Sequence, residues 1–312
     1  MKFEFLIIIF SLGAVSLESC AQNEKKTTPE KVTVKEETAP KAKKNLAVNF
    51  KEYWYSGTAE LTSYTLDQAR YGEMRGGNAV LIYVTEPFLA DKQVKADGSN
   101  ADNIPVLKLN STKNYITGIY PYSLMTSSFY PVHDDAHAVK LSFSAQEWCG
   151  HIYAQLNNRE QFDVVSHSYF ENEADQNFTL EKSILENEIW NKIRINPSNL
   201  PLGTSEVIPS LEYIRQTHKP LKAYTATMRI DAENDSISTY TISYPELERT
   251  LKIDFTTAFP HTIEGWSETY SSGYGDKAKI LTTTAIKNKL IITPYWQQNK
   301  NSDLFLRDSL GL

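Results

Sequence analysis

The sequence predicts an all-β protein, mainly antiparallel, built as one large curved sheet or open barrel with one packed helix. Apolar and polar residues alternate strictly in several segments, such as Val139–Gln146 and Leu251–Thr256. Turn-forming residues separate these segments at short spacing, as at Glu233–Asp235 and Ser272–Gly273. A helical period of apolar residues stands out in one longer segment. No glycine-rich nucleotide-binding motif is present, which argues against a nucleotide-binding α/β fold.

The first residues resemble a bacterial lipoprotein signal peptide, which we assign to residues 1–19. An apolar stretch from Phe5 to Val15 is too short to span a bilayer but suits the core of a secretory signal. Leu17 and Ser19 place an aliphatic residue and a small residue before Cys20, as in a lipobox. We therefore expect lipidation of Cys20, with acyl chains such as palmitate. The alternative is an ordinary secretory signal with an incidental cysteine.

Residues 20–46 are predicted to be the lipidated cysteine and a flexible tether. Lys and Glu dominate this stretch and Pro29 and Pro40 interrupt it, so it cannot bury enough apolar surface to fold. Ala21, rather than an aspartate, follows the cysteine, which favours transport to the outer membrane. We expect a β-rich envelope domain at residues 47–312, anchored to the membrane through Cys20 and facing the periplasm or the cell surface.

Composition narrows the range of partners. The formal net charge is −6, and the part of the chain after the tether carries about −8. An acidic body argues against nucleic acid as a partner, because phosphate binding needs clustered Lys and Arg. The second of the two cysteines is Cys149, so an acylated Cys20 leaves no intramolecular disulfide. The candidate partners are an envelope protein, a lipid or a glycan, and we expect no cofactor.

Within the body, short predicted elements follow one another closely. Turn residues at Tyr71–Gly72 predict a hairpin, and residues 223–296 read as a meander of about six strands. Apolar residues from Leu180 to Ile193 recur at helical spacing, with Thr179 as a cap before them and a proline beyond them. A second, short helix is predicted near residues 209–216.

The segment Trp148–His151 is the most unusual cluster for chemistry. Apolar residues change from odd to even positions here, so we expect a β-bulge or bend near Gln146–Glu147. Cys149 and His151 are weak catalytic candidates, as a thiol nucleophile with its base, or a metal-binding pair. Residues i and i+2 of a strand are about 7 Å apart at Cα, however, which exceeds a thiol–imidazole hydrogen bond. The alternative is an inert cysteine.

Two further groups are candidates for binding, each with a simpler alternative. His133 and His137 could bind a divalent metal ion together with the aspartates between them, but a solvated acidic turn is the favoured explanation. Trp148, Trp266 and Tyr122 could line a ligand-binding pocket or pack as cross-strand pairs.

Charged residues complete the candidates. Glu171, Glu173 and Asp175 could supply paired carboxylates for acid–base work on a glycan, or form a solvated loop. Arg70 and Arg75, on either side of the predicted hairpin turn, read as a surface charge pattern.

The chain also resembles a group of bacterial outer-membrane lipoproteins that are often labelled septum formation inhibitor, or Maf. The resemblance rests on residues 60–64, 68–72, 120–123, 146–151, 153–157 and 295–299. It implies no catalytic residues. The label itself does not suit this sequence, because true Maf proteins are cytoplasmic nucleotide pyrophosphatases with a Ser- and Arg-rich motif near the start, and that motif is absent here.

Two functional hypotheses follow. In the first, the β-rich domain binds a ligand or partner in the cell envelope and is not an enzyme. In the second, it is an envelope hydrolase acting on a glycan or lipid. A cleft in which Cys149, His151 and a carboxylate converge would favour the hydrolase, whereas an apolar pocket would favour binding. A purely structural subunit would instead expose an apolar patch.

Overall fold

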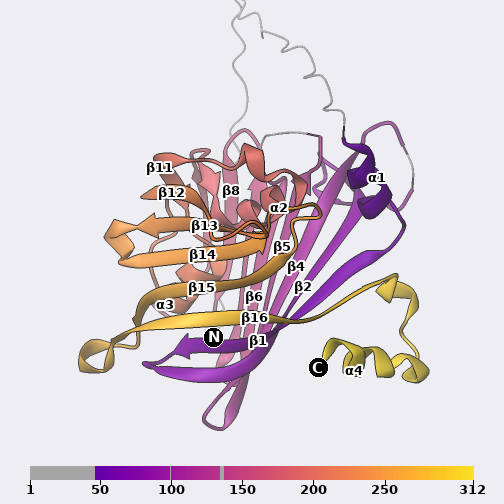
Figure 1. The fold of residues 1–312 in the computed structure, drawn as a ribbon. Coiled ribbons are helices and arrows are strands. Elements are labelled where there is room, and N and C mark those ends of the chain that lie inside the picture. Colours follow the sequence, from indigo (N-terminus) through magenta and orange to yellow (C-terminus); the bar gives the residue numbers. More distant parts are fainter. Residues whose placement is uncertain (1–45, 99, 134–136) are drawn as a thin grey trace, which may run out of the picture. The chain divides into compact units, whose positions relative to one another are not determined.

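The computed structural model describes residues 46–98, 100–133 and 137–312, which belong to one compact unit. The expected signal peptide, Cys20 and all but the last residue of the expected tether lie outside the described residues. The described part is an all-β protein with one large, curved and unclosed sheet and a few helices, as the sequence predicts (Figure 1).

The first half of the described chain supplies one helix and nine strands before the sheet reaches an edge. They are α1 (Val48–Trp54), β1 (Ala59–Arg70), β2 (Glu73–Leu89), β3 (Val94–Lys95), β4 (Asn103–Thr117), β5 (Tyr120–Pro131), β6 (Lys140–Glu147), β7 (Gly150–Asn158), β8 (Phe162–Ser168) and β9 (Gln176–Leu180).

The second half returns from the other edge. Its elements are β10 (Ile184–Leu185), α2 (Glu186–Ile195), β11 (Gly203–Ile208), α3 (Leu211–Thr217), β12 (Tyr224–Ala232), β13 (Ile237–Tyr244), β14 (Arg249–Thr256), β15 (Ile263–Ser272), β16 (Lys279–Thr293) and α4 (Phe305–Leu310). Short 3₁₀ turns lie at Pro197–Asn199, Pro245–Leu247, Gly275–Lys277, Tyr295–Gln297 and Asn301–Asp303.

Two strands that follow one another in the sequence, β9 and β10, form the two opposite edges of the sheet. The order is β10-β11-β12-β13-β14-β15-β16-β1-β2-β4-β5-β6-β7-β8-β9, with β3 paired to β2. Strands β1 and β16 pair antiparallel in the middle of the sheet, while β9 and β10 form its two ends although only three residues separate them in sequence. Apart from the short parallel pair β10–β11, neighbouring strands are antiparallel. The sheet therefore stays open between β9 and β10.

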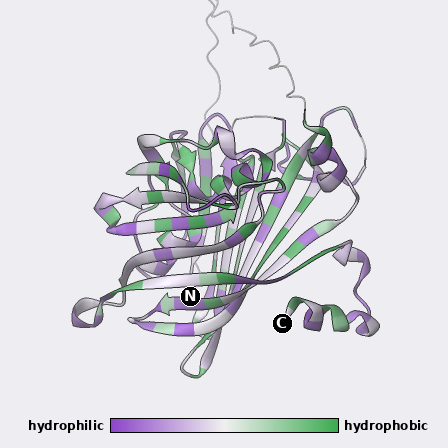
Figure 2. Ribbon diagram, in the orientation of Figure 1, coloured by the Kyte–Doolittle hydropathy of each residue, from purple (hydrophilic) through white to green (hydrophobic). Residues whose placement is uncertain are grey.

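Alternating side chains make the concave face of the sheet apolar. In β7, Ile152, Ala154 and Leu156 are buried, while His151 before them and Tyr153 among them are exposed. Figure 2 shows this alternation as changing colour along the strands. The buried residues join the main core, which fills the space inside the curve.

Helix α2 lies inside this curve, between strands β11–β15 and strands β2 to β8 (Figure 1). Asn191 donates to the Leu107 carbonyl of β4 at 2.7 Å, and Tyr83 of β2 donates to the Trp190 carbonyl at 3.2 Å. The helix begins later than predicted: Thr179 and Leu180 belong to β9, since they pair with Asp163 and Phe162 of β8. The helical spacing of the apolar residues continued by coincidence through an edge strand.

Several other expectations need correction. Residues 223–296 contain five strands, not six. The change of apolar parity near Gln146–Glu147 comes from a hairpin turn at Trp148–Cys149, with Glu147 paired to Gly150, rather than from a bulge within one strand. The predicted hairpin at Tyr71–Gly72 is confirmed, and both residues have the positive φ angles, 56° and 75°, that such a turn requires.

Candidate functional site

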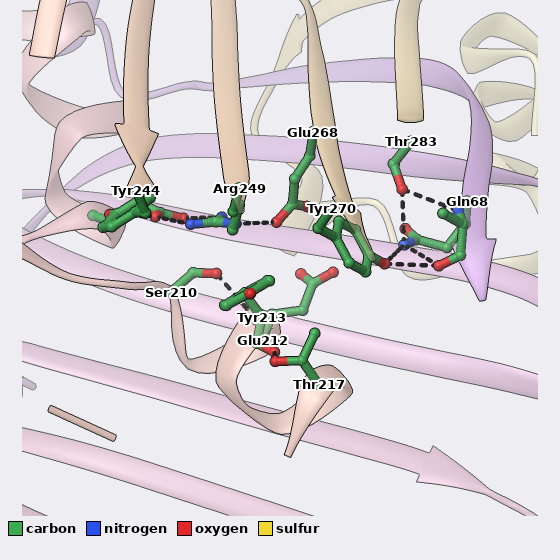
Figure 3. Close-up of polar contacts among 12 residues, drawn as sticks. Gln68, Ser210, Glu212, Tyr213, Thr217, Tyr244, Arg249, Glu268, Tyr270 and Thr283 are labelled. Atoms are coloured by element: carbon green, nitrogen blue, oxygen red, sulfur yellow. Dashed lines mark hydrogen bonds and ion pairs between the residues drawn. The ribbon is translucent and has the colours of Figure 1, made fainter. Parts of the chain in front are cut away.

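Helix α3 contributes to the lining of three of the four pockets described among residues 46–312. It confirms the short helix predicted near residues 209–216, and Ser210 caps it by accepting a hydrogen bond from the Tyr213 amide at 3.1 Å. Figure 3 shows Tyr213 facing the strands that carry Arg249 and Tyr270. The Arg249 guanidinium carbon lies 4.1 Å from the centre of the Tyr213 ring, so this helix face is held against the sheet.

The other side of α3 forms one wall of a pocket of about 460 Å³, which we call the α3 pocket. Strands β6 to β9, which end at the open edge, supply the opposite wall. The apolar members of the lining are Phe143, Ile152, Ala154, Phe178, Leu211, Ile214, Pro220 and Leu221. Its polar members are Ser166, Asn172, Glu173, Gln176, Arg215, His218 and Lys219. The volume lies within the range of pockets that hold small molecules.

The polar rim of the α3 pocket centres on Glu173, in the loop between β8 and β9. Its Oε1 lies 3.1 Å from Nη1 of Arg215 and 2.6 Å from Nδ1 of His218. The Ser168 hydroxyl donates to Oε2 at 2.6 Å. The Arg215 guanidinium also lies 4.4 Å from the centre of the Phe170 ring. These contacts fasten the loop to the end of α3.

Burial and charge act in opposite directions on this cluster. Partial burial alone would raise the pKa of Glu173, but hydrogen bonds from His218 and Ser168 and the charge of Arg215 outweigh it, so this pKa lies below its ordinary value. Burial, opposed by Glu173 and assisted by the charge of Arg70, lowers the pKa of the Arg215 guanidinium, which stays protonated at neutral pH. The rim therefore holds a charged ion pair.

The rim lacks the arrangement of a hydrolytic triad. A serine nucleophile needs a hydrogen bond to its histidine base, which a carboxylate orients in turn. Here Glu173 stands between Ser168 and His218 and takes a hydrogen bond from each side. The arrangement can position a polar group of a ligand at the mouth of an apolar pocket.

The structure does not bring the predicted catalytic pair into a pocket. Cys149 is exposed in the turn between β6 and β7, and His151 is exposed on β7. A hydrogen bond with Glu147 and the charge of that carboxylate raise the pKa of the Cys149 thiol, which disfavours the reactive thiolate. Neither residue lines any of the four pockets described among residues 46–312.

The three aromatic residues predicted to bind a ligand differ in their burial and in their neighbours. Trp148 is 68% exposed in the β6–β7 turn. Trp266 is buried and meets Trp190 edge to face at 5.4 Å, beside a cavity of about 50 Å³. Tyr122 is buried and stacks on Tyr115 at 5.0 Å. Two of the three therefore pack in the interior, and the pockets described here do not unite them.

The predicted metal-binding loop is only partly described. Asp134 and Asp135 lie outside the described residues. Nδ1 of His137 lies 3.1 Å from Oε1 of Glu188, so this imidazole is engaged by α2. Within the described ranges, no group of three or more His, Cys, Asp or Glu side chains is placed to bind a metal ion together.

Sequence reasoning missed the residues that form the α3 pocket. Glu173 belongs to the acidic run in the sequence, but no local pattern links it to Arg215 and His218. Both residues lie more than 40 positions further along the chain. The one available signal was the predicted short helix, whose apolar Leu211 and Ile214 lie three residues apart on one helical face. The packing of this helix opposite β6 to β9 depends on the tertiary fold and cannot be predicted from local sequence.

Comparison of the chain with protein-family models, with curated proteins and with solved structures found no match. In the part of the chain that the structure describes, no helix combines the length and the apolar character needed to cross a membrane.

Proposed function

We propose that this chain is an outer-membrane lipoprotein whose β-rich domain binds an amphipathic ligand, with an apolar chain and a polar head, in the α3 pocket. The observation that carries the proposal is the burial pattern of the lining: its fully buried members are all apolar and form a floor, whereas its charged members are partly or fully exposed and form a rim. An acyl chain gains about 0.8 kcal/mol for each methylene group that it buries, so such a floor favours a lipid-like ligand.

The polar rim suits the head group of the same ligand. Arg215, His218 and Lys219 lie at one end of α3, and Glu173 joins the first two. The Arg215 Nε is buried and has no hydrogen-bond partner, so the rim retains a donor that a ligand head group could use. The apolar floor fixes the chain and the rim fixes its orientation.

The anchor expected at Cys20 fits this function. Acyl chains on one cysteine would hold the domain at the membrane surface, and the tether of about 25 residues would allow a span of roughly 25–30 Å. The domain would then sample lipid-like molecules in the envelope without crossing the bilayer. The hydrolase alternative lacks support, since the rim provides no hydrogen bond between a nucleophile and its base.

Binding of an acyl chain can be tested directly with the full chain in detergent micelles, after the fluorescence of the probe in micelles alone has been subtracted. The probe is 11-(dansylamino)undecanoic acid, whose fluorescence rises in an apolar site. Ile214→Glu places a charge in the apolar wall of the pocket and should weaken binding about tenfold or more. Ile286→Glu makes the same change at a residue that is 68% exposed on β16, and should bind like the unmodified chain.

Two results would contradict the proposal. One is failure of the unmodified chain to bind the probe at micromolar concentration. The other is equal binding by the Ile214→Glu and Ile286→Glu variants, provided that circular dichroism shows both to be folded.

A further inference from the structure

A second pocket lies beside the C-terminal end of α3 and carries a buried arginine without a carboxylate partner. Among the described residues, three arginines are at least nine-tenths buried: Arg70, Arg194 and Arg249. Arg194 donates to both carboxylate oxygens of Glu60, and Arg249 donates to both oxygens of Glu186. A buried charge is costly unless it is paired, so these two pairs are the expected arrangement.

Arg70 departs from this arrangement because its contacts are all with neutral groups. Its Nη1 donates to the Gln216 carbonyl at 2.6 Å, and its Nη2 donates to the hydroxyls of Tyr71 at 3.1 Å and Tyr122 at 3.3 Å. The Tyr71 ring lies 4.1 Å from the guanidinium carbon. Among the described residues, no ion pair joins Arg70 to a carboxylate. These contacts hold the guanidinium in place but leave its charge without a counter-ion.

The guanidinium lines a pocket of about 560 Å³, which we call the Arg70 pocket. Gln216, also about nine-tenths buried, lines the same pocket. Two buried donors in this wall have no partner, Nε of Arg70 and Nε2 of Gln216. An unsatisfied buried donor costs free energy, and an acceptor on a ligand would remove that cost.

The charges around the Arg70 pocket leave an excess of positive charge. Lys219 lines it together with Arg70, and the carboxylates in its wall are Glu246 and Glu248. Glu246 is paired with Lys222, at 3.2 Å between Nζ and Oε1. The single carboxylate of Glu248 therefore faces two cationic side chains.

The other residues that line the Arg70 pocket indicate the chemistry of the rest of the ligand. Tyr213, Tyr270 and Tyr274 lie in the wall, and Tyr274 is 57% exposed. Hydroxyl groups of Thr217, Ser271 and Ser272 lie among them. Aromatic rings beside many hydroxyl and carboxyl groups suit a sugar ring better than an acyl chain, because a sugar offers both C–H faces and hydroxyl groups.

We propose that the Arg70 pocket binds an anionic sugar, with its carboxylate or phosphate group held by Arg70. Guanidinium groups bind both anions through charge-assisted hydrogen bonds. The two pockets share Lys219 in their linings, but the residues that carry the two proposals differ: Arg70 and Gln216 lie only in this pocket, and Ile214 and Arg215 only in the α3 pocket. Either site can fail without the other.

Isothermal titration of the full chain in detergent tests the proposal with three probes of similar size: glucuronate, glucose 6-phosphate and glucose. At least one anionic sugar should bind about tenfold more tightly than glucose. The tighter of the two identifies the anionic group as carboxylate or phosphate. Equal binding of all three, or binding of none, would overturn the proposal.

Variants connect the binding to this pocket. Arg70→Gln should weaken binding of the preferred anionic sugar about tenfold or more. Glu248→Gln removes an exposed negative charge from the wall and should strengthen binding roughly twofold. Arg229→Gln, which removes an exposed positive charge outside this pocket, should leave binding unchanged.

The variant Glu248→Gln also keeps the test decisive if Arg70→Gln fails to fold, since Glu248 lies at the surface. Unchanged affinity in Glu248→Gln, or in a folded Arg70→Gln, would overturn the assignment.

Discussion

Arg194 of α2 donates two parallel hydrogen bonds, each 2.6 Å long, to the carboxylate of Glu60 on β1. Both side chains are about 1% exposed. The Arg194 Nε donates to the Pro260 carbonyl at 3.0 Å, and the Tyr53 hydroxyl donates to Glu60. This cluster joins the central helix to the middle of the sheet, where the first and last strands meet.

Breaking this pair from one side should strongly destabilise the fold. Glu60→Gln leaves the Arg194 charge buried without a carboxylate, which should reduce the free energy of unfolding by about 3–5 kcal/mol. The matched change Glu246→Gln removes one partner of an exposed pair with Lys222 and should cost about 1 kcal/mol or less. Urea unfolding followed by circular dichroism measures both. Similar losses in the two variants would show that the Glu60–Arg194 pair contributes no more to stability than an exposed ion pair.

The lowered pKa of Glu173 predicts a specific pH dependence. Because the folded state binds the proton more weakly, Glu173 stabilises the fold above its ordinary pKa of about 4.3, and this contribution disappears as the pH falls through the folded value. Glu173→Gln should therefore lower stability at pH 7 and reduce its loss below pH ~5.

Urea unfolding at a series of pH values tests this, with Glu171→Gln as the control at an exposed position of the same loop. Glu171→Gln should follow the unmodified chain at every pH. If the curve of Glu173→Gln also stays parallel to that of the unmodified chain, the ion pair at the pocket rim does not contribute to folding.

Cys149 should react slowly with thiol reagents although it is exposed. The nearby Glu147 carboxylate raises the pKa of the thiol, so little thiolate exists at neutral pH. Glu147→Gln should accelerate the reaction with iodoacetamide at pH 7, and Cys149→Ser should leave binding of the acyl probe unchanged. Alkylation of the unmodified chain faster than that of free cysteine would restore the nucleophile hypothesis.

The predicted lipid anchor can be tested separately. Cys20→Ala removes the predicted acylation site, so the chain should move from the membrane fraction to the soluble fraction and lose incorporation of labelled palmitate. Ser19→Ala keeps a small residue before the cysteine and should remain in the membrane fraction. A Cys20→Ala chain that still sediments with membranes after washing in high salt would contradict the anchor.

Local patterns predicted the elements whose signals lie within a few residues. The alternation from Val139 to Gln146 predicted β6, and Tyr71–Gly72 predicted the hairpin between β1 and β2. The start of α2 was predicted too early, because Leu180 fits both a helical face and an edge strand, and pairing with Phe162 decides between them. A single sequence carries no signal for that pairing.

The pockets could not be predicted for the same physical reason. Arg70 stands beside a turn and reads as a solvated charge, but the fold buries it to 7% exposure against Gln216 and Tyr122. Glu173 reads as one member of a solvated acidic run until α3 brings Arg215 to it. Contacts between residues so distant in sequence depend on the order of strands in the sheet, which local composition does not encode.

The most direct test of the proposed function is native mass spectrometry of the full chain, purified in mild detergent from its own envelope, with organic extraction of the same sample. We predict an added mass that extraction releases and that contains an acyl chain, and that is lost in the Ile214→Glu variant. A homogeneous mass equal to that of the processed, acylated chain, unchanged by extraction, would contradict binding of an amphipathic ligand in the α3 pocket.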